Sequence, residues 1–505
     1  MKLLESIECE KGITLNSQLV DLLLILDDTD LTTEEQDSKI EQYVEDLRDR
    51  QKRYQLACDK GEMYQFLADE IMPSIDGLSP EQIKQLKIIY LSNISSLNIC
   101  NKKSMEQILE ANGFDKSIYE RIMIELNTRD YTAKEGILLL TPEKVRGLYN
   151  HMFENGNRYD RVTFDDVGKF SGYVGGDGET YTKEKIEKMQ RFCESHNMKS
   201  KINALMFYAD FPKGYEMSLE SKGESEEEKK RLIQKSLFDY VKNIGKSYGD
   251  RIEAVDIFNE LIYDPNMKED GFDELTDEYR YRTQGWHKYL SLEDMCKMAL
   301  LARKKMPNVK FTYNDMNWTD PKKREKIIKL LQKIQETEKR FRTEEIKIDG
   351  EVFKLEERET LIDFIGFEAH LTTEVDLDEM ENAFNAVISE IGLPIEITEL
   401  DVACVGQDLE NEIKKQGEVF RKIMDMIQSY PEIVSLTIWS QSDECSFMNS
   451  KLGRIAYASL LNKFFVEKEI PEKIKGKDGR TDCFDGIRVI SVGSTKSEDV
   501  DKQQV

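Results

Sequence analysis

Long apolar runs are missing from this 505-residue sequence. The run LVDLLLIL at residues 19–26 is too short to span a bilayer and contains Asp21. The N-terminus MKLLESIECEKG carries Glu5, Glu8 and Glu10 where a signal peptide needs an uninterrupted apolar stretch. From these residues we expect a cytoplasmic protein that does not insert into membranes.

The sequence also has fewer basic than acidic residues. The sequence has 72 basic and 98 acidic residues, which gives a formal net charge of −26. Phosphate binding needs a basic surface, so nucleic acid is excluded as a main partner and anionic lipid is disfavoured. A neutral polar ligand is unaffected by this balance, and the acidity itself is typical of a highly soluble protein.

Paired cysteines are absent as well. The eight cysteines are scattered, with no CxxC pair and none near a histidine at zinc-binding spacing. We therefore expect free thiols in a reducing compartment and no structural zinc site. No glycine-rich phosphate loop occurs, and the sequence predicts neither a metal nor a cofactor.

What is present is enough apolar sequence for a large core, since 39% of the residues are hydrophobic and 34% are charged. Residues 1–130 space their apolar positions at three and four, which is typical of amphipathic helices. SPEQ at residues 79–82 resembles a helix start, with serine at the cap and proline at the first helical position. We interpret residues 1–130 as a helical accessory region of unknown role, which offers a possible docking surface for a protein partner.

From about residue 133, short apolar runs alternate with amphipathic helices. Strands are predicted at residues 136–140, 161–167, 201–211, 251–260, 309–316, 361–371, 394–402 and 433–440, and the final helix at 454–465. Eight strands alternating with eight helices predict the α/β class and a (β/α)8 TIM barrel. A doubly wound open sheet is the second choice, because no GxGxxG follows the first predicted strand.

The predicted barrel domain covers residues 131–466. Within it, residues 337–358 interrupt the alternation, and Asp349 and Gly350 between two short apolar runs predict a hairpin insertion. Residues 467–505 are polar and are predicted to form a C-terminal extension.

Polar and acidic residues follow the predicted strands. In a TIM barrel the C-terminal strand ends form the active site, so these side chains are expected to meet at one mouth. They are Asp165, Asp166, Tyr208, Asp210, Asn259, Glu260, Asn314, Asp315, Glu368, His370, Glu399, Asp401, Trp439 and Asp443. A ring of acids without a basic counterpart predicts acid/base chemistry on a neutral polar substrate.

Two of these carboxyls have the pattern that glycoside hydrolysis needs. Glu260 closes AVDIFNE at 254–260, and Glu399 lies in ITELDV at 397–402. One protonated carboxyl donates to the leaving oxygen, while an ionised one attacks the sugar. A separation of about 5 Å gives retention of configuration and a wider one gives inversion.

The sequence around both glutamates resembles glycoside hydrolase family 10, the endo-β-1,4-xylanases. AVDIFNE resembles the acid/base motif WDVVNE of that family, and ITELDV matches its nucleophile motif. Further segments fit in the same order, namely VTFDDVGKF, ARKKMPNVKFTYNDMN, IDFIGFEAHL, IWSQSDECSF and RIAYASL. The resemblance covers roughly residues 133–465 and leaves out the N-terminal region.

The resemblance implies a role for each matching residue. Glu260 would be the acid/base, with its pKa raised by the nearby charge of Glu399, the nucleophile. His370 and Asp401 would orient Glu399, and Asn259 would bind the sugar 2-hydroxyl. The remaining candidate substrate-binding residues are Lys169, Asp165, Asp166, Asn203, Tyr208, Glu368 and Trp439.

Several positions depart from the family pattern. Asn203 stands in place of a histidine, Phe207 and Phe447 in place of tryptophans, Glu368 in place of a glutamine and Asp166 in place of an asparagine. We therefore predict a retaining hydrolase that acts on β-1,4-linked xylan or xylo-oligosaccharides, with retention better supported than the choice of sugar. The alternatives are a related retaining barrel glycosidase for another β-glucan or β-glycoside and a catalytically silent carbohydrate-binding barrel. Trp286 and Trp318, in predicted loops, are candidates for stacking on sugar faces.

Overall fold

The structure is a computed structural model. It describes residues 8–60, 63–75, 77–92, 102–115, 117–119, 121–122, 134, 136–153, 156, 158–170, 179–210, 225–249, 251–265, 280–282, 285–439, 441–446, 448–452 and 455–459. The predicted C-terminal extension at 467–505 and the departure at Phe447 lie outside these residues.

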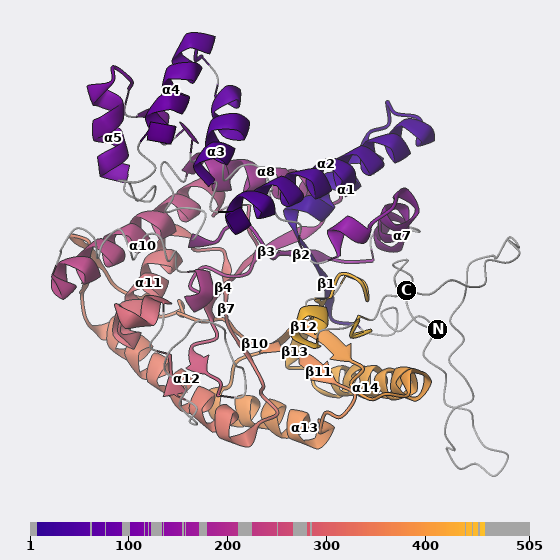
Figure 1. The fold of residues 1–505 in the computed structure, drawn as a ribbon. Coiled ribbons are helices and arrows are strands. Elements are labelled where there is room, and N and C mark those ends of the chain that lie inside the picture. The colour runs from indigo at the N-terminus through magenta and orange to yellow at the C-terminus, as the bar shows by residue number, and fades with distance from the viewer. Residues whose placement is uncertain are drawn as a thin grey trace, which may run out of the picture.

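Eight parallel strands close into a barrel (Figure 1). Each strand pairs with the next along the chain, β10 pairs with β12, and β13 pairs back with β1. The closed ring confirms the (β/α)8 prediction over the open sheet. Its strands are β1 (Glu10–Leu15), β2 (Arg161–Phe164), β3 (Lys199–Ile202), β4 (Ala254–Asn259), β7 (Lys310–Met316), β10 (Phe364–Glu368), β12 (Ile395–Ala403) and β13 (Ile433–Ile438).

The first strand is not where the sequence predicted it. The apolar run at 136–140 forms a 3-10 turn, Ile137–Leu139, which begins at Gly136 in a left-handed conformation (φ 71°). The strand that closes the barrel is β1, within the region predicted to be helical, and it pairs with β2 and β13. Gly12 allows this close pairing, because a Cβ there would lie 2.6 Å from Thr437 Oγ1 on β13.

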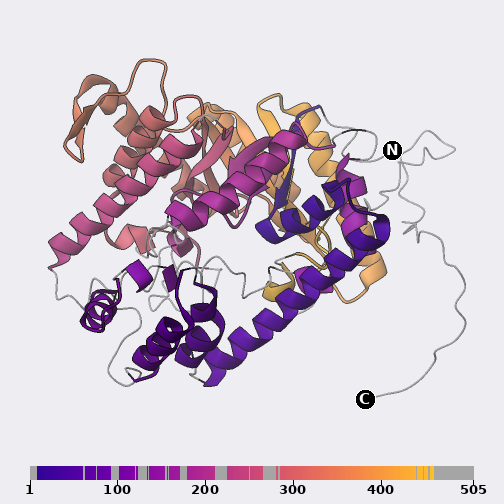
Figure 2. The ribbon, with the colours of Figure 1, turned by 90° about the horizontal axis from the view of Figure 1, so that it is seen from above.

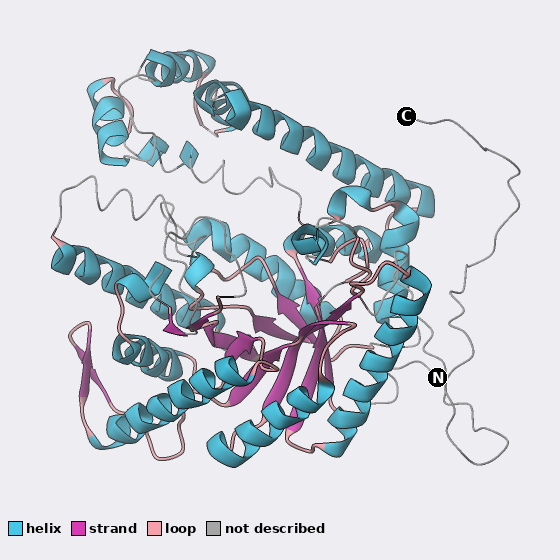
Figure 3. Cartoon of the chain, turned by 60° about the horizontal axis from the view of Figure 1, so that its bottom comes forward, coloured by secondary structure: helices cyan, strands magenta, loops and turns pink. Residues whose placement is uncertain are grey.

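The N-terminal helices therefore lie between β1 and β2 in the chain. They are α1 (Ser17–Asp27), α2 (Thr33–Lys60), α3 (Met63–Phe66), α4 (Pro80–Ser92) and α5 (Lys102–Ala111), before α7 (Pro142–Phe153) leads into β2. Residues of α1 and the first half of α2, such as Leu19 and Val44, belong to the barrel core. Residues between Ala57 and Ile122 form a second, separate core, at the end of α2 (Figures 2 and 3).

The later helices surround the sheet. They are α8 (Glu179–Ser195), α10 (Glu226–Tyr248), α11 (Leu292–Lys305), α12 (Pro321–Thr343), α13 (Leu377–Ala386), α14 (Leu409–Ser429) and the short α15 (Met448–Leu452). The local sequence determines where two of these helices begin. Ser291 and Asp294 form a capping box before α11. Asp320 caps α12, whose first residue is a proline. Among the described residues, no helix combines the length and apolar character that a membrane crossing requires.

The predicted hairpin insertion and the predicted final helix both differ from the structure. The hairpin at Asp349 and Gly350 joins β8 (Ile346–Ile348) to β9 (Glu351–Phe353), and both turn residues have positive φ, as a tight two-residue turn requires. It is shorter than the predicted 337–358 insertion, because α12 continues to Thr343. Of the helix predicted at 454–465, residues 455–459 are not helical, and they accept backbone hydrogen bonds from Val402 and Cys404 beside β12.

Candidate active site

The end of β4 sets the position of Glu260. Its backbone N–H donates to the carbonyl of Asn314 on β7 at 2.8 Å. Its φ of 50° lies in the left-handed region, which is uncommon outside glycine and often marks functional turns. The side chain is buried at the barrel mouth.

Glu399, in the middle of β12, has three hydrogen-bond donors. Its Oε1 accepts from Nδ2 of Asn203 at 3.2 Å and from Nδ2 of Asn314 at 2.9 Å. Its Oε2 lies 2.9 Å from Nε2 of His370. Three hydrogen-bond donors therefore surround one buried carboxyl.

His370 connects Glu399 to a second carboxylate. The pairing of β11 (His370–Thr372) with β12 sets His370 opposite Asp401, and the two side chains meet at 3.2 Å. Burial acts to lower the pKa of His370, but Asp401 and Glu399 outweigh it and raise the pKa to about 9. The imidazole is therefore protonated at neutral pH and donates from both nitrogens.

Arg282 is a contact of Glu260 that the sequence did not reveal. Its Nη2 lies 3.1 Å from Glu260 Oε2, and its Nε donates to the Glu260 carbonyl at 2.6 Å. The guanidinium is buried and lies 3.5 Å from the ring centroid of Tyr208. It follows β6 (Arg280–Tyr281), which pairs with β5 (Ile262–Tyr263) directly after the glutamate. This pairing is tertiary, so no periodic pattern in the sequence signals it.

Asn314 holds the polar groups of the mouth together. Its Nδ2 lies 3.0 Å from Asn259 Oδ1, 2.8 Å from Glu368 Oε1 and 2.9 Å from Glu399 Oε1. Its Oδ1 accepts from Thr398, and Gly366 on β10 leaves room for it. One asparagine thus fixes the spacing of side chains from three strands.

The remaining predicted residues have varied surroundings. Lys169 Nζ lies 3.9 Å from Asp210 Oδ2. Burial acts to lower the pKa of Lys169, but nearby carboxylates outweigh it and raise this pKa, so the lysine stays charged. These carboxylates are Asp210, Asp165, Asp166 and Glu399. Asp166 accepts from the backbone and hydroxyl of Ser17, at the start of α1. Partly exposed Trp439 packs edge-on to His370, with 6.0 Å between ring centroids.

Asn203, Trp286 and Trp318 are buried, and their side-chain N–H groups donate within the protein. Asn203 donates to Asp256 and to Glu399, which uses both of its amide hydrogens. Trp286 is fully buried, so the stacking role considered for it is wrong. Trp318 donates to two backbone carbonyls and stacks on Phe367 at 4.3 Å.

A groove of about 300 Å³ opens beside Glu368 and His370. Its walls come from the segments after β7 and β11 and from α13. The lining residues include Asn317, Trp318, Thr372, Asp376 and Met380.

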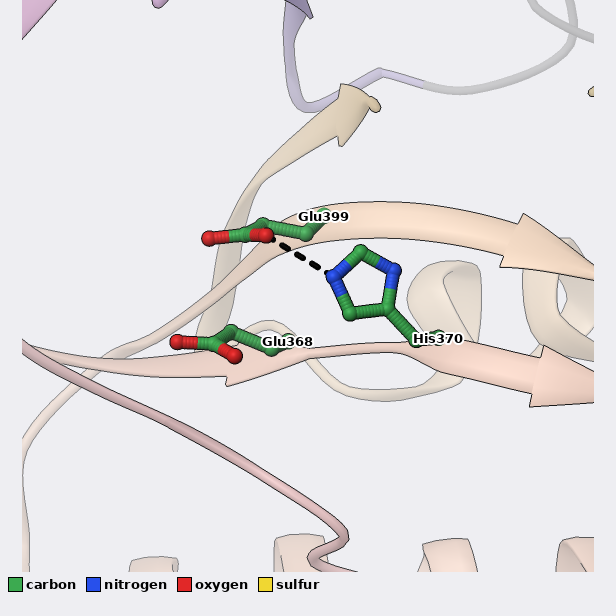
Figure 4. A group of neighbouring side chains, drawn as sticks. All are labelled: Glu368, His370 and Glu399. Atoms are coloured by element: carbon green, nitrogen blue, oxygen red, sulfur yellow. Dashed lines mark hydrogen bonds and ion pairs between the residues drawn. The ribbon is translucent and has the colours of Figure 1, made fainter. Parts of the chain in front are cut away.

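Glu368, His370 and Glu399 form a compact group (Figure 4). One nitrogen or oxygen from each lies within 4.8 Å of the others. A protonated His370, bonded to carboxylates on both sides, has no lone pair for a metal ion.

The chain matches one known protein family over most of its length. The family model for Glycosyl hydrolase family 10 matches residues 140–475, more than half of the chain. Endo-1,4-beta-xylanase A of Caldicellulosiruptor saccharolyticus is 25% identical over 298 residues, which are 56% of this chain and 76% of that protein. Endo-1,4-beta-xylanase A of Caldicellulosiruptor sp. (strain Rt8B.4) is 23% identical over 316 residues, and the match spans 41% of that protein.

A solved structure shows the same fold. Xylanase B from Clostridium stercorarium F9 superimposes with a TM-score of 0.51 at 17% identity, covering 64% of this chain and 89% of the other. A likeness at this identity supports the barrel alone, while the family match covers both glutamate motifs. The chain belongs to glycosyl hydrolase family 10.

Proposed function

We propose that the chain is a retaining glycoside hydrolase that cleaves β-1,4-linked xylan or xylo-oligosaccharides by double displacement. Glu260 is the acid/base and Glu399 the nucleophile. The observation that carries the proposal is the double contact of Asn314. Its carbonyl accepts from the backbone of Glu260, and its amide donates to the carboxylate of Glu399. The Glu260 backbone and the Glu399 side chain therefore meet at one asparagine in the barrel mouth.

In the first half-reaction Glu399 attacks the anomeric carbon. Asn203, Asn314 and His370 keep its charge in place and aim it. Glu260 gives its proton to the leaving oxygen as the glycosidic bond breaks. In the second half-reaction Glu260 takes a proton from water, which releases the sugar from Glu399 with retained configuration.

Asn259 is the hydrogen-bond donor to the sugar. Its Oδ1 accepts from Asn314, which orients the amide so that its NH2 group is available for the 2-hydroxyl of the bound sugar. Bonds to this hydroxyl strengthen in the transition state. The xylan assignment rests on the family and on relatives whose names describe xylanases.

Activity assays on single-site variants test the proposal. Glu260→Ala is expected to slow hydrolysis of xylo-oligosaccharides by about 10²–10⁴-fold, the usual contribution of a general acid. Added azide should restore turnover of an activated aryl β-xyloside and give the β-xylosyl azide, since a small anion can replace the base. Glu357→Gln, at an exposed carboxyl, is the matched control.

A substrate panel distinguishes the alternatives. Xylan and aryl β-xylosides should be cleaved faster than mixed-linkage glucan and aryl β-glucosides. The reverse order would reassign the sugar while keeping the mechanism. A wild-type protein that releases no sugar from any aryl glycoside would overturn the proposal and favour a binding barrel.

A further inference from the structure

A third carboxyl lies in the mouth beside the two glutamates of the proposed mechanism. Glu368 ends β10, between β7 and β12, and is 5% exposed. It also lines the groove that opens at the mouth. Figure 4 shows its carboxyl side by side with that of Glu399, from the neighbouring strand.

The small number of hydrogen-bond donors near Glu368 favours the neutral form of this carboxyl. Glu399 accepts from Asn203, Asn314 and His370. Glu368 accepts from Asn314 alone among the described residues, at 2.8 Å. That nitrogen carries two hydrogens but has three acceptors within 3.0 Å, so Glu368 shares even this donor.

The charges around Glu368 point the same way. Glu399 faces it from β12, Glu260 from the end of β4 and Asp315 from β7, and all three are acidic. Two cations lie nearby, Lys323 on α12, whose Nζ lies 2.8 Å from Asp315, and the protonated His370. His370 on β11 donates to Glu399 and Asp401 instead. Burial, followed by Glu399, Glu260 and Asp315, raises the pKa of Glu368 well above its usual value.

We propose that Glu368 works as a neutral carboxylic acid whose O–H group donates a hydrogen bond to the sugar bound beside Glu399. A protonated carboxyl has the same planar shape as a primary amide, with one acceptor and one donor. A protonated Glu368 can therefore replace the glutamine that the family pattern has at this position. The proposal rests on the function proposed above, because it assigns the sugar to the same mouth.

Ionisation of Glu368 removes this donor and adds a second negative charge next to Glu399. Sugar binding is then lost as pH rises through the pKa of Glu368. An amide at this position cannot ionise. Glu368→Gln should keep the donor at every pH, whereas Glu368→Leu should lack it at every pH.

Kinetics with a 2,4-dinitrophenyl β-glycoside separate Glu368 from Glu260, because this leaving group needs no general acid. At pH 6, Glu368→Leu should lower kcat/KM by roughly 10-fold or more, the order of one lost buried hydrogen bond. Glu368→Gln should recover most of that loss and abolish the fall of kcat/KM at alkaline pH. Equal loss in both variants, or an unchanged alkaline limb in Glu368→Gln, would overturn the proposal.

Thermal unfolding provides a second readout that does not depend on activity. The pKa of Glu368 in the folded protein lies above 4.5, the ordinary value for a glutamate, so the carboxyl ionises more easily in the unfolded chain. Folding is therefore increasingly opposed as pH rises above 4.5. Glu368→Gln should therefore gain in Tm over wild type progressively above pH 4.5, and Glu357→Gln should not. A constant difference between pH 4.5 and 8 contradicts a neutral Glu368, even if the wild-type protein hydrolyses no glycoside.

Discussion

Charge compensation at single residues decides what the mouth of this barrel can do. Each carboxyl there has a different partner: His370 for Glu399, Arg282 for Glu260 and a shared amide for Glu368. The two cations favour negative charge on the carboxyl beside them, whereas the shared amide leaves Glu368 without a cationic partner of its own. Acid/base chemistry at neutral pH needs carboxyls in both protonation states.

The Arg282 contact gives the first prediction. A guanidinium beside Glu260 stabilises its ionised form, although the first half-reaction needs it protonated. Arg282→Gln should therefore move the basic limb of kcat/KM for phenyl β-xyloside upward by about one pH unit or more, the usual effect of losing one cationic neighbour. Arg282→Lys, which keeps the charge, should move it less. An unmoved limb in Arg282→Gln, with normal thermal unfolding, would mean that the arginine only supports the backbone of Glu260.

The second prediction concerns pH and His370. Its pKa is raised from 6.5 to about 9, so the charged form stabilises the fold. This stability is fully present below pH 6.5 and is lost as pH rises to about 9. The Tm difference between wild type and His370→Asn should therefore shrink over this interval in thermal unfolding scans. A difference that stays constant from pH 6 to 9.5 would argue that the imidazole is neutral.

At the scale of secondary structure, sequence periodicity was informative where strands are apolar on both faces. The β12 strand, buried along its whole length, was predicted within one residue at each end. The strand β1 was missed, because EKGITL begins with two charged residues and a glycine. The competing run at 136–140 is more apolar, but its first residue, Gly136, has a positive φ, and the run forms a single turn.

The active-site residues could be read from sequence only in part. Glu260 directly follows β4, Glu399 and Asp401 lie within β12, and His370 begins β11, so barrel topology collects them at one mouth. The partners of Asp166 and Asn203 could not be inferred, since Ser17 and Asp256 lie 149 and 53 positions away and only the closed barrel brings them near.

The placement of β1 predicts how truncated chains behave. A chain that begins at residue 131 lacks β1, which leaves the edges of β2 and β13 unpaired, so it should aggregate without cooperative unfolding. Replacing residues 61–133 with a Gly/Ser linker removes most of the separate helical core and should leave a cooperatively unfolding barrel. Circular dichroism and calorimetry of both proteins provide the measurement. A folded, active 131–505 fragment would contradict the role of β1 in closing the barrel.

At the scale of the whole molecule, the net charge of −26 affects which substrates approach easily. Neutral xylo-oligosaccharides should show kcat/KM values that change less than about twofold with added salt, since nothing on them is screened. Xylan that carries uronic-acid groups is repelled at low ionic strength, so its kcat/KM should rise as NaCl is added. Parallel salt series on both substrates measure this, and identical salt responses would show that the mouth does not sense the overall charge.

Covalent trapping of the glycosyl-enzyme tests the central claim most directly. A 2-deoxy-2-fluoro β-xyloside with a dinitrophenyl leaving group slows both half-reactions, but the good leaving group allows the first to proceed. Mass spectrometry of the intact protein and its peptides should then show one sugar attached to Glu399, and Glu399→Gln should remain unlabelled. A label on any other residue, or a reaction product of inverted configuration, would contradict the assignment of Glu399 as the nucleophile.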